Sequence, residues 1–301
     1  MIRIDSSRKF QTIIGFGVTV PVSAASVYGD GFYETLINDL GCSIVCSESG
    51  SEIASALKSI KPELILTSRD RPENVVSNMS TKATWGYLMA LRVRDPSANL
   101  SSIYDFSYSR MVYADKFLIE EGAVDILWKA VFEDKSEISV RDPIFFTAIP
   151  SGALDLAAGI SCALTNGFCA FITGPATTTC TKDSVTKALC DMGKKGPKFQ
   201  AAKHFFKYVT PGMTRIEATG GSNTLLVNAF QSDQTVVNLI NSGAVIVDEQ
   251  IEFLGSESRQ YTVFTSVEND FHHQDFGSMT GSKIDISLVP YSITTLIVEG
   301  P

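Results

Sequence analysis

The sequence changes its hydrophobic periodicity near residue 210, and this change constrains the fold more than any other feature. Before it, short apolar runs alternate with stretches of helical period, a pattern that predicts parallel βα units. After Gly212 we predict seven short strands, separated by Gly, Ser, Asn and Asp, at 213–219, 224–230, 235–241, 246–254, 260–266, 283–289 and 292–298. Evenly spaced strands of this length are typical of an antiparallel β-sandwich. The predicted fold class is therefore α/β plus all-β.

The region before residue 210 contains several apolar runs with helical stretches between them. The stretch 150–167 has apolar residues at the i, i+3, i+4 and i+7 positions of a helix, with Ser151 placed to cap it and Gly167 to end it. Two more helices are expected at 32–40 and 111–120. The predicted strands of this region are 13–22, 42–46, 64–67, 126–132, 144–147 and 168–172.

A last helix is expected to begin at Pro197, a favourable residue for a first turn, and to stop at the triplet 210–212. His204 lies within it beside two phenylalanines, so we expect this histidine to have a structural role. The side chains predicted to point inward are Phe199, Ala202, Phe205, Phe206 and Val209.

Composition excludes several classes of partner. The net charge is −8 and the basic residues are scattered, so nucleic acid is not expected as a partner. No run reaches the roughly 18 apolar residues of a membrane span. The six cysteines form no CxxC pair, and the adjacent histidines within 269–275, expected on a hairpin loop, rarely converge on one ion. We therefore expect no metal site and no cofactor.

The N-terminal segment lacks the apolar core of a signal peptide, which fits either a cytosolic chain or a mature secreted one. Asn78 and Asn99 each begin an Asn-x-Ser sequon. The two sequons favour a secreted, extracellular protein glycosylated at these asparagines. Cys180 and Cys190 are ten positions apart, so a disulfide could close that stretch, but six cysteines allow 15 pairings.

Five stretches, in order along nearly the whole chain, resemble glycoside hydrolase family 30, the group of glucosylceramidase, β-1,6-glucanases and glucuronoxylanases. They are 10–17 (FQTIIGFG), 205–212 (FFKYVTPG), 227–230 (VNAF), 236–239 (VVNL) and 288–296 (LVPYSITTL). The resemblance implies a βα-barrel packed on a β-sandwich that the N-terminal strand 2–5 completes. We accordingly expect a truncated βα-barrel-like domain over 7–209 and a β-sandwich domain over 1–6 and 210–301.

The resemblance also implies two catalytic carboxylates, and both positions depart from the family pattern. The nucleophile position, between Phe145-Phe146-Thr147 and the helix at 153–157, holds Ala148, whose methyl group cannot attack an anomeric carbon. The acid/base of the family lies near Glu133 or Asp134, but its Asn-Glu-Pro signature is absent. We therefore expect both catalytic positions to be degenerate.

The spacing between these two positions is also too short for a full barrel. Asp134 and Ala148 are only 14 positions apart, whereas the family places about two βα units there, each of about 30 residues. The fifth and sixth barrel strands are therefore expected to be missing. A reduced, about six-stranded barrel-like sheet should remain, with strand 126–132 beside strand 144–147.

Four residues are candidates for carbohydrate contacts. By the resemblance, Arg69 lies in the third-strand segment where the family has sugar-stacking aromatics, and Trp128 lies in the fourth-strand segment of the acid/base. Thr173 and Thr177 lie near the end of the last predicted barrel strand. The threonines around 174–180 could instead satisfy the backbone of their own loop.

Three hypotheses of function follow. The first is a catalytically inactive glycoside-hydrolase-like protein, a pseudo-glycosidase that binds carbohydrate or acts as a structural or interaction module with another protein. The second is a retaining β-glycosidase of family 30 whose nucleophile has been replaced by Ala148. The third is a fragment or designed miniature whose only purpose is to fold.

Overall fold

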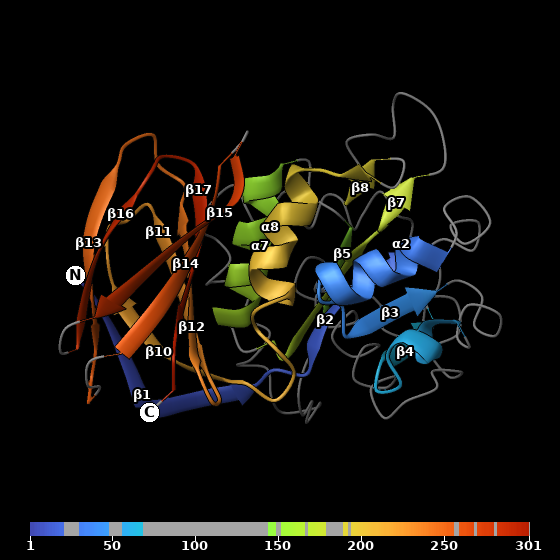
Figure 1. Ribbon diagram of the computed structural model, residues 1–301, viewed down its shortest axis with the longest axis horizontal. Coiled ribbons are helices and arrows are strands. Elements are labelled where there is room, and N and C mark those ends of the chain that lie inside the picture. The colour runs from blue at the N-terminus through green and yellow to red at the C-terminus, as the bar shows by residue number, and fades with distance from the viewer. Residues whose placement is uncertain are drawn as a thin grey trace, which may run out of the picture.

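The computed structural model contains two large β-sheets with helices packed between them (Figure 1). The structure describes residues 1–20, 30–47, 56–68, 144–148, 152–165, 168–178, 189–191, 194–255, 259–267, 270–279 and 282–300. The strand predicted at 126–132 and the helix predicted at 111–120 lie outside these ranges. Within them, no helix is long and apolar enough to cross a membrane.

The first sheet is parallel and has five described strands in the order β4-β3-β2-β6-β5. Within this sheet, β2 comes first along the chain and β6 comes last, and the two strands pair with each other, as the first and last strands of a βα-barrel do. Each strand coincides within about two residues with a predicted apolar run, because runs buried on both faces mark parallel strands directly in the sequence. The strands are β2 (Gly15–Val20), β3 (Ile44–Ser47), β4 (Ile65–Ser68), β5 (Ile144–Ala148) and β6 (Ala170–Gly174).

Helices flank this sheet. The predicted helix 32–40 is observed as α2 (Asp30–Glu34), which continues as a π-helical turn, η1 (Thr35–Asp39). The stretch 150–167 forms α7 (Ala153–Thr165), whose buried face carries the predicted apolar residues. Helix α8 (Pro197–Phe206) begins at Pro197, as predicted. All five side chains expected to point inward from it are buried.

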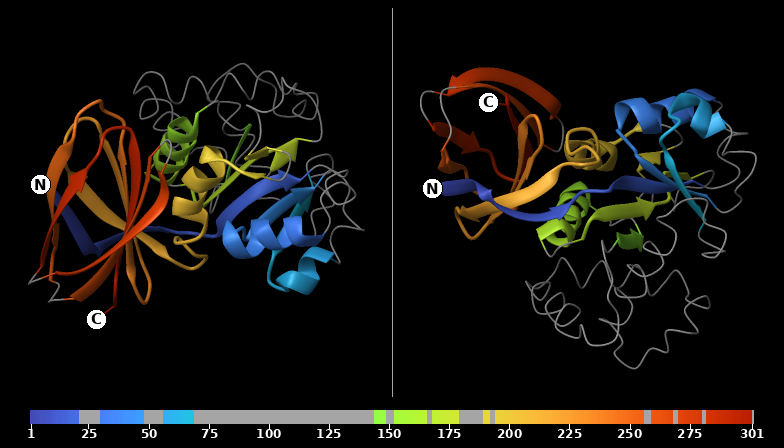
Figure 2. Two further views of the ribbon diagram at one scale, coloured as in Figure 1. Left: turned by 45° about the horizontal axis from the view of Figure 1, so that its top comes forward. Right: turned by 90° about the horizontal axis from the view of Figure 1, so that it is seen from below.

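The second large sheet is a single curled sheet of nine strands, in the order β15-β14-β17-β12-β11-β10-β1-β13-β16. Figure 2 shows that it rolls around its own apolar core. Its strands are β1 (Ile2–Thr12), β10 (Thr214–Gly220), β11 (Leu225–Gln231), β12 (Thr235–Asn241), β13 (Val247–Phe253), β14 (Arg259–Val267), β15 (Asp270–Met279), β16 (Lys283–Leu288) and β17 (Ser292–Val298).

Two details of this sheet differ from expectation. The N-terminal strand joins it, as the resemblance implies, but β1 pairs antiparallel with β10 on one side and parallel with β13 on the other. It therefore bridges the two layers into one hydrogen-bonded sheet and runs on to Thr12, past residue 6. In addition, residues 270–275 of the segment expected as a hairpin loop belong to strand β15, which pairs with β14. The sequence of β15 is mostly polar and lacks the apolar–polar alternation that would predict a strand.

A shared core joins the two sheets through the helices between them. Phe16 of β2 stacks on Phe206 of α8, with ring centroids 5.0 Å apart. The same cluster of buried side chains includes Phe230, Val236 and Ile293 of the curled sheet. Burial of this apolar surface on both sides of the helical layer stabilises both sheets together.

Candidate functional site

The carboxyl ends of the parallel strands form the candidate site. In α/β folds with parallel strands, ligands bind at this edge because the loops that follow the strands converge there. Five described strands end on it, at Val20, Ser47, Ser68, Ala148 and Gly174 (Figure 1).

The register of the sheet places the expected nucleophile position on this edge. Ala148 pairs with Gly174, and Thr147 pairs with Thr173 in the row before. Gly174 has a packing role, because a Cβ atom there would lie 1.6 Å from Oγ1 of Thr19 on the neighbouring strand. The chain stays beside β2 after this glycine, because the amide of Ala176 donates a hydrogen bond to the carbonyl of Thr19 at 2.7 Å.

The two faces of the sheet can be assigned from strand alternation. One face carries a small cluster that includes Ile44 and Ile172, whereas Val18 and Val45 belong to the core on the helix side. Thr173 lies in the row of Val18 and Val45, so its fully buried side chain is on the helix-facing side. It therefore does not share a face with Gly174, which adjoins Ala148.

Thr177 lies in β7 (Thr177–Thr178), part of a small sheet with β8 (Cys190–Asp191) and β9 (Lys194–Lys195). It is buried, and neither its hydroxyl nor that of Thr173 has a hydrogen-bond partner among the described residues. The other sequence candidates lie outside those residues: Glu133, Asp134, Arg69, Trp128, Asn78, Asn99 and Cys180.

The described strand ends carry no ionisable carboxylate, imidazole, ammonium or guanidinium group. Their sequences are GVTV, IVCS, ILTS, IFFTA and AFITG. The polar groups of this part of the edge are therefore hydroxyls and a thiol. Hydroxyl groups both donate and accept hydrogen bonds and stay uncharged near neutral pH. This part of the edge can therefore bind a polar, uncharged molecule through hydrogen bonds.

Metal binding finds no support in the described part of the chain, where no group of three or more His, Cys, Asp or Glu residues could hold an ion. The adjacent His272 and His273 follow one another along strand β15. Among the described residues, Cys42 and Cys190 have no disulfide partner.

Lys198 is an ionisable residue that the sequence analysis did not single out. It lies in the first turn of α8 and is buried, and burial lowers its pKa to about 8, although the charge of Asp155 acts in the opposite direction. Asp155 lies in the first turn of α7, the helix that follows Ala148. No local signal identifies this pair, because its two members are 43 positions apart and on different helices.

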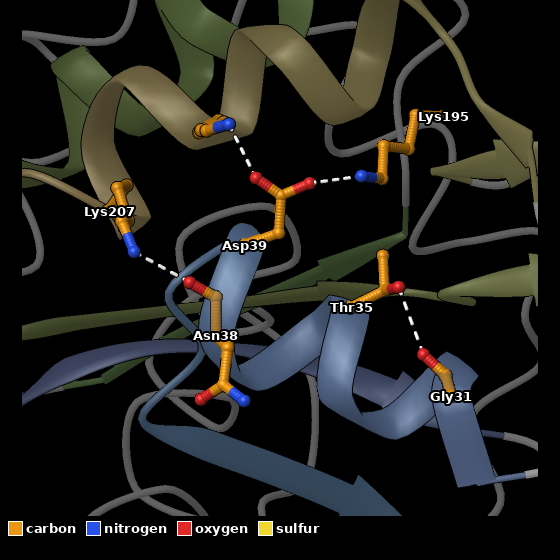
Figure 3. A network of polar contacts seen from close by, with 7 residues as sticks. Gly31, Thr35, Asn38, Asp39, Lys195 and Lys207 are labelled. Atoms are coloured by element: carbon orange, nitrogen blue, oxygen red, sulfur yellow. Dashed lines mark hydrogen bonds and ion pairs between the residues drawn. The ribbon is translucent and has the colours of Figure 1, made fainter.

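Polar contacts join η1 to strand β9 and to helix α8 with its C-terminal cap residue, Lys207 (Figure 3). The carboxylate of Asp39 forms ion pairs with Lys195 and Lys203, and the ammonium of Lys207 donates a hydrogen bond to the carbonyl of Asn38 at 2.6 Å. Burial would raise the pKa of Asp39, but the hydrogen bonds from the two lysines outweigh it and hold that pKa below its ordinary value. We call these contacts the closure seam.

No family model matches the sequence, and no curated protein matches it. Solved structures do match. An endoxylanase of glycoside hydrolase family 30 from Clostridium papyrosolvens C71 has a TM-score of 0.67 at 14% identity, and the match covers 99% of this chain and 100% of that one. The chain has a glycoside-hydrolase-like fold.

Two other solved structures match over a similar share of the chain. The family 30 subfamily 8 xylanase from Clostridium acetobutylicum gives a TM-score of 0.67 at 13% identity, covering 99% of both chains. The endo-β-1,6-glucanase BT3312 gives a TM-score of 0.60 at 10% identity, covering 100% of this chain and 94% of that one. At such identities the likeness concerns the fold alone. The xylanase and glucanase activities belong to those proteins.

Proposed function

We propose that the chain is a glycoside-hydrolase-like protein without glycosidase activity that binds neutral carbohydrate at the carboxyl edge of its parallel sheet. One observation carries the proposal. The described strand ends hold no carboxylate, and Ala148 occupies the strand end where the resemblance to family 30 expects the nucleophile.

The mechanism of retaining glycosidases explains why the absence of a carboxylate at position 148 excludes that mechanism. Such an enzyme needs two carboxyl groups about 5–5.5 Å apart, one of which attacks the anomeric carbon. Alanine has no group that can form the glycosyl-enzyme bond. The hydroxyls of Thr19 and its neighbours on the edge can still form hydrogen bonds with sugar hydroxyls. The glycoside-hydrolase-like fold supports a carbohydrate as the molecule bound there.

A pair of variants at Ala148 tests the absence of catalysis. We expect no turnover of aryl β-glycosides by the parent chain, by Ala148→Glu or by the uncharged control Ala148→Gln, because restoring one carboxylate does not supply an acid/base partner. Turnover by Ala148→Glu well above that of Ala148→Gln would contradict the proposal. It would support the alternative of a retaining β-glycosidase that lacks only its nucleophile.

A second pair of variants tests binding at the edge. Calorimetric titration with xylo-oligosaccharides and β-1,6-gluco-oligosaccharides should detect binding, and Thr19→Val should weaken it about fivefold through the loss of one hydrogen bond. Thr262→Val on β14, in the other sheet, is the matched control and should leave affinity unchanged. If Thr19→Val, Thr262→Val and the parent bound the oligosaccharides with equal affinity, the carboxyl edge of the parallel sheet would not be the binding site.

We also propose that the protein is secreted and glycosylated, on the basis of the sequons at Asn78 and Asn99. Expression in a eukaryotic secretory system should give a product whose mass falls on treatment with an N-glycosidase. Asn78→Gln with Asn99→Gln should abolish that change. An unmodified parent product would contradict the proposal.

A further inference from the structure

Four exposed apolar side chains lie on two adjacent loops at one end of the curled sheet. One loop joins β12 to β13 and the other joins β16 to β17. The exposed fractions are 64% for Val245, 60% for Ile246, 38% for Val289 and 58% for Tyr291. We call these four residues the two-loop patch. Large apolar side chains gathered on one surface of a soluble protein mark interaction sites.

A fully buried asparagine fixes the two loops relative to each other. The side-chain amide of Asn241 donates hydrogen bonds to the carbonyls of Val245 at 2.9 Å and Val289 at 3.0 Å, one on each loop. Its Oδ1 accepts a hydrogen bond from the amide of Gly243 at 3.0 Å. The amide of Tyr291 then donates to the carbonyl of Gly243 at 3.2 Å. The patch is therefore preorganised, which lowers the entropy lost on binding a partner.

The backbone at Tyr291 is strained. Its φ is +51°, and no other described residue except glycine has a positive φ. Left-handed backbone is unfavourable for a bulky residue and persists only where surrounding contacts enforce it. More than half of the Tyr291 side chain is exposed, so the strain does not bury the ring in the protein's own core. The strained turn presents an aromatic ring to the outside, where a partner can cover it.

The charge pattern indicates what kind of partner this is. Segments 241–247 and 288–293 contain no charged residue, in a chain of net charge −8. At a twofold contact each side chain near the axis faces its own copy, so a charged residue there would repel itself. The centres of protein interfaces are likewise poor in Lys, Glu and Asp and rich in Tyr. An uncharged patch is where two copies of this acidic chain can approach.

We propose that the two-loop patch is the centre of a twofold contact between two copies of this chain. Four side chains cover less than the roughly 800 Å² per partner of a stable interface, so the contact is weak and depends on concentration. The proposal is independent of the proposed function, because the patch belongs to the curled sheet and not to the carboxyl edge of the parallel sheet.

Sedimentation velocity over rising concentration, up to about 1 mM, tests the contact. The weight-average mass of the parent should rise from 32.6 kDa towards twice that value, 65.2 kDa. Ile246→Glu and Tyr291→Glu should weaken self-association at least about tenfold, because each places a charge opposite its own copy. Leu254→Glu is the matched control: Leu254 is exposed and lies at the opposite end of β13 from Ile246.

Circular dichroism should show that all three variants are folded, since the altered side chains are exposed. A parent that stays at 32.6 kDa throughout would overturn the proposal. Self-association that survives both patch variants, or that Leu254→Glu removes equally, would also overturn it. A monomeric parent that binds phosphatidylcholine vesicles or xylo-oligosaccharides, and loses this binding in Ile246→Glu, would assign the patch to that ligand and overturn the contact between copies.

Discussion

At the scale of single residues, Gly41 shows how one backbone position holds two elements together. Its φ is +92°, and a Cβ atom there would lie 2.5 Å from the carbonyl oxygen of Phe206 at the end of α8. Gly41→Ala therefore combines an unfavourable backbone conformation with a clash against rigid backbone. We expect it to lower the free energy of unfolding by about 3 kcal/mol, measured by urea denaturation.

Gly31→Ala is the control for this substitution. Gly31 lies within α2, has no positive φ, and would place a Cβ atom with no other atom within 4 Å. Alanine is favoured over glycine inside a helix, so this variant should be unchanged or up to about 1 kcal/mol more stable. Equal free energies of unfolding for Gly41→Ala and Gly31→Ala would contradict the close packing of Gly41 against α8.

A second residue-scale prediction concerns His204. This side chain is fully buried, with Nδ1 2.8 Å from Oγ1 of Thr295 and Nε2 2.8 Å from Oγ of Ser266. His204→Phe keeps a ring of similar size but removes both contacts, and should cost about 2 kcal/mol of stability because buried hydroxyls lose a partner. Adding Ser266→Ala should recover part of this loss in a double-mutant cycle. Additive effects would show that the two side chains do not interact.

The sequence predicts the structural role of His204 from its neighbours on the helix. It does not predict the partners, because Ser266 and Thr295 are 62 and 91 positions away. The same limit applies to Lys198 and Asp155. Periodicity reports which face of an element is buried, but not which distant side chain it meets.

At the scale of elements, the closure seam should make stability depend on pH. The pKa of Asp39 is below its ordinary value in the folded protein, so its ion pairs with Lys195 and Lys203 stabilise the fold above the unfolded pKa. That contribution is lost as pH falls below about 4 and the carboxylate is protonated. Asp39→Asn should cost about 1 kcal/mol at pH 7, since the pairs are partly open to solvent, and progressively less in acid.

Urea denaturation of parent and variant from pH 7 to pH 3 measures this difference. Asp233→Asn, in an exposed turn of the curled sheet, is the control for the loss of an exposed carboxylate. A pH-independent difference for Asp39→Asn would mean that the seam acts through packing alone.

The elements themselves were predicted better than their connections. The parallel strands and α8 follow from short apolar runs and from Pro197, signals that a few neighbouring residues carry. The π-helical turn at the end of α2 and the strand β15 were missed, because neither has a distinctive local period. The carboxyl edge was located through strand ends, yet assigning Thr173 to the helix-facing side required the register of three strands.

At the scale of the whole molecule, long-range pairing decides the architecture. Strand β1 pairs in parallel with β13, and this pairing places Ile2 beside Ile251. The two residues are far apart in the sequence. An alternating pattern indicates a strand and its buried face, but the pairing order depends on contacts that no local window contains. For this reason the sequence predicted a sandwich, and the structure has one curled sheet.

The curled sheet and the parallel sheet should unfold together, because one apolar core joins them through α7 and α8. Leu296 tests this cooperativity. It lies on β17, a central strand between β12 and β14, and its side chain is fully buried in the core of the curled sheet. Leu296→Asp buries a carboxylate without a partner and should cost about 4 kcal/mol, lowering the melting temperature by about 10 °C.

Differential scanning calorimetry gives both readouts. Because the shared core couples the sheets, the parent and Leu296→Asp should each show one transition, shifted as a whole in the variant. Leu254→Asp makes the same chemical change at an exposed position of the same sheet, where water hydrates the charge, so its midpoint should stay close to that of the parent. Equal midpoints for Leu296→Asp and Leu254→Asp would mean that β17 is not packed in the core. A split into two transitions, with only one displaced, would mean that the sheets unfold independently despite the contacts between them.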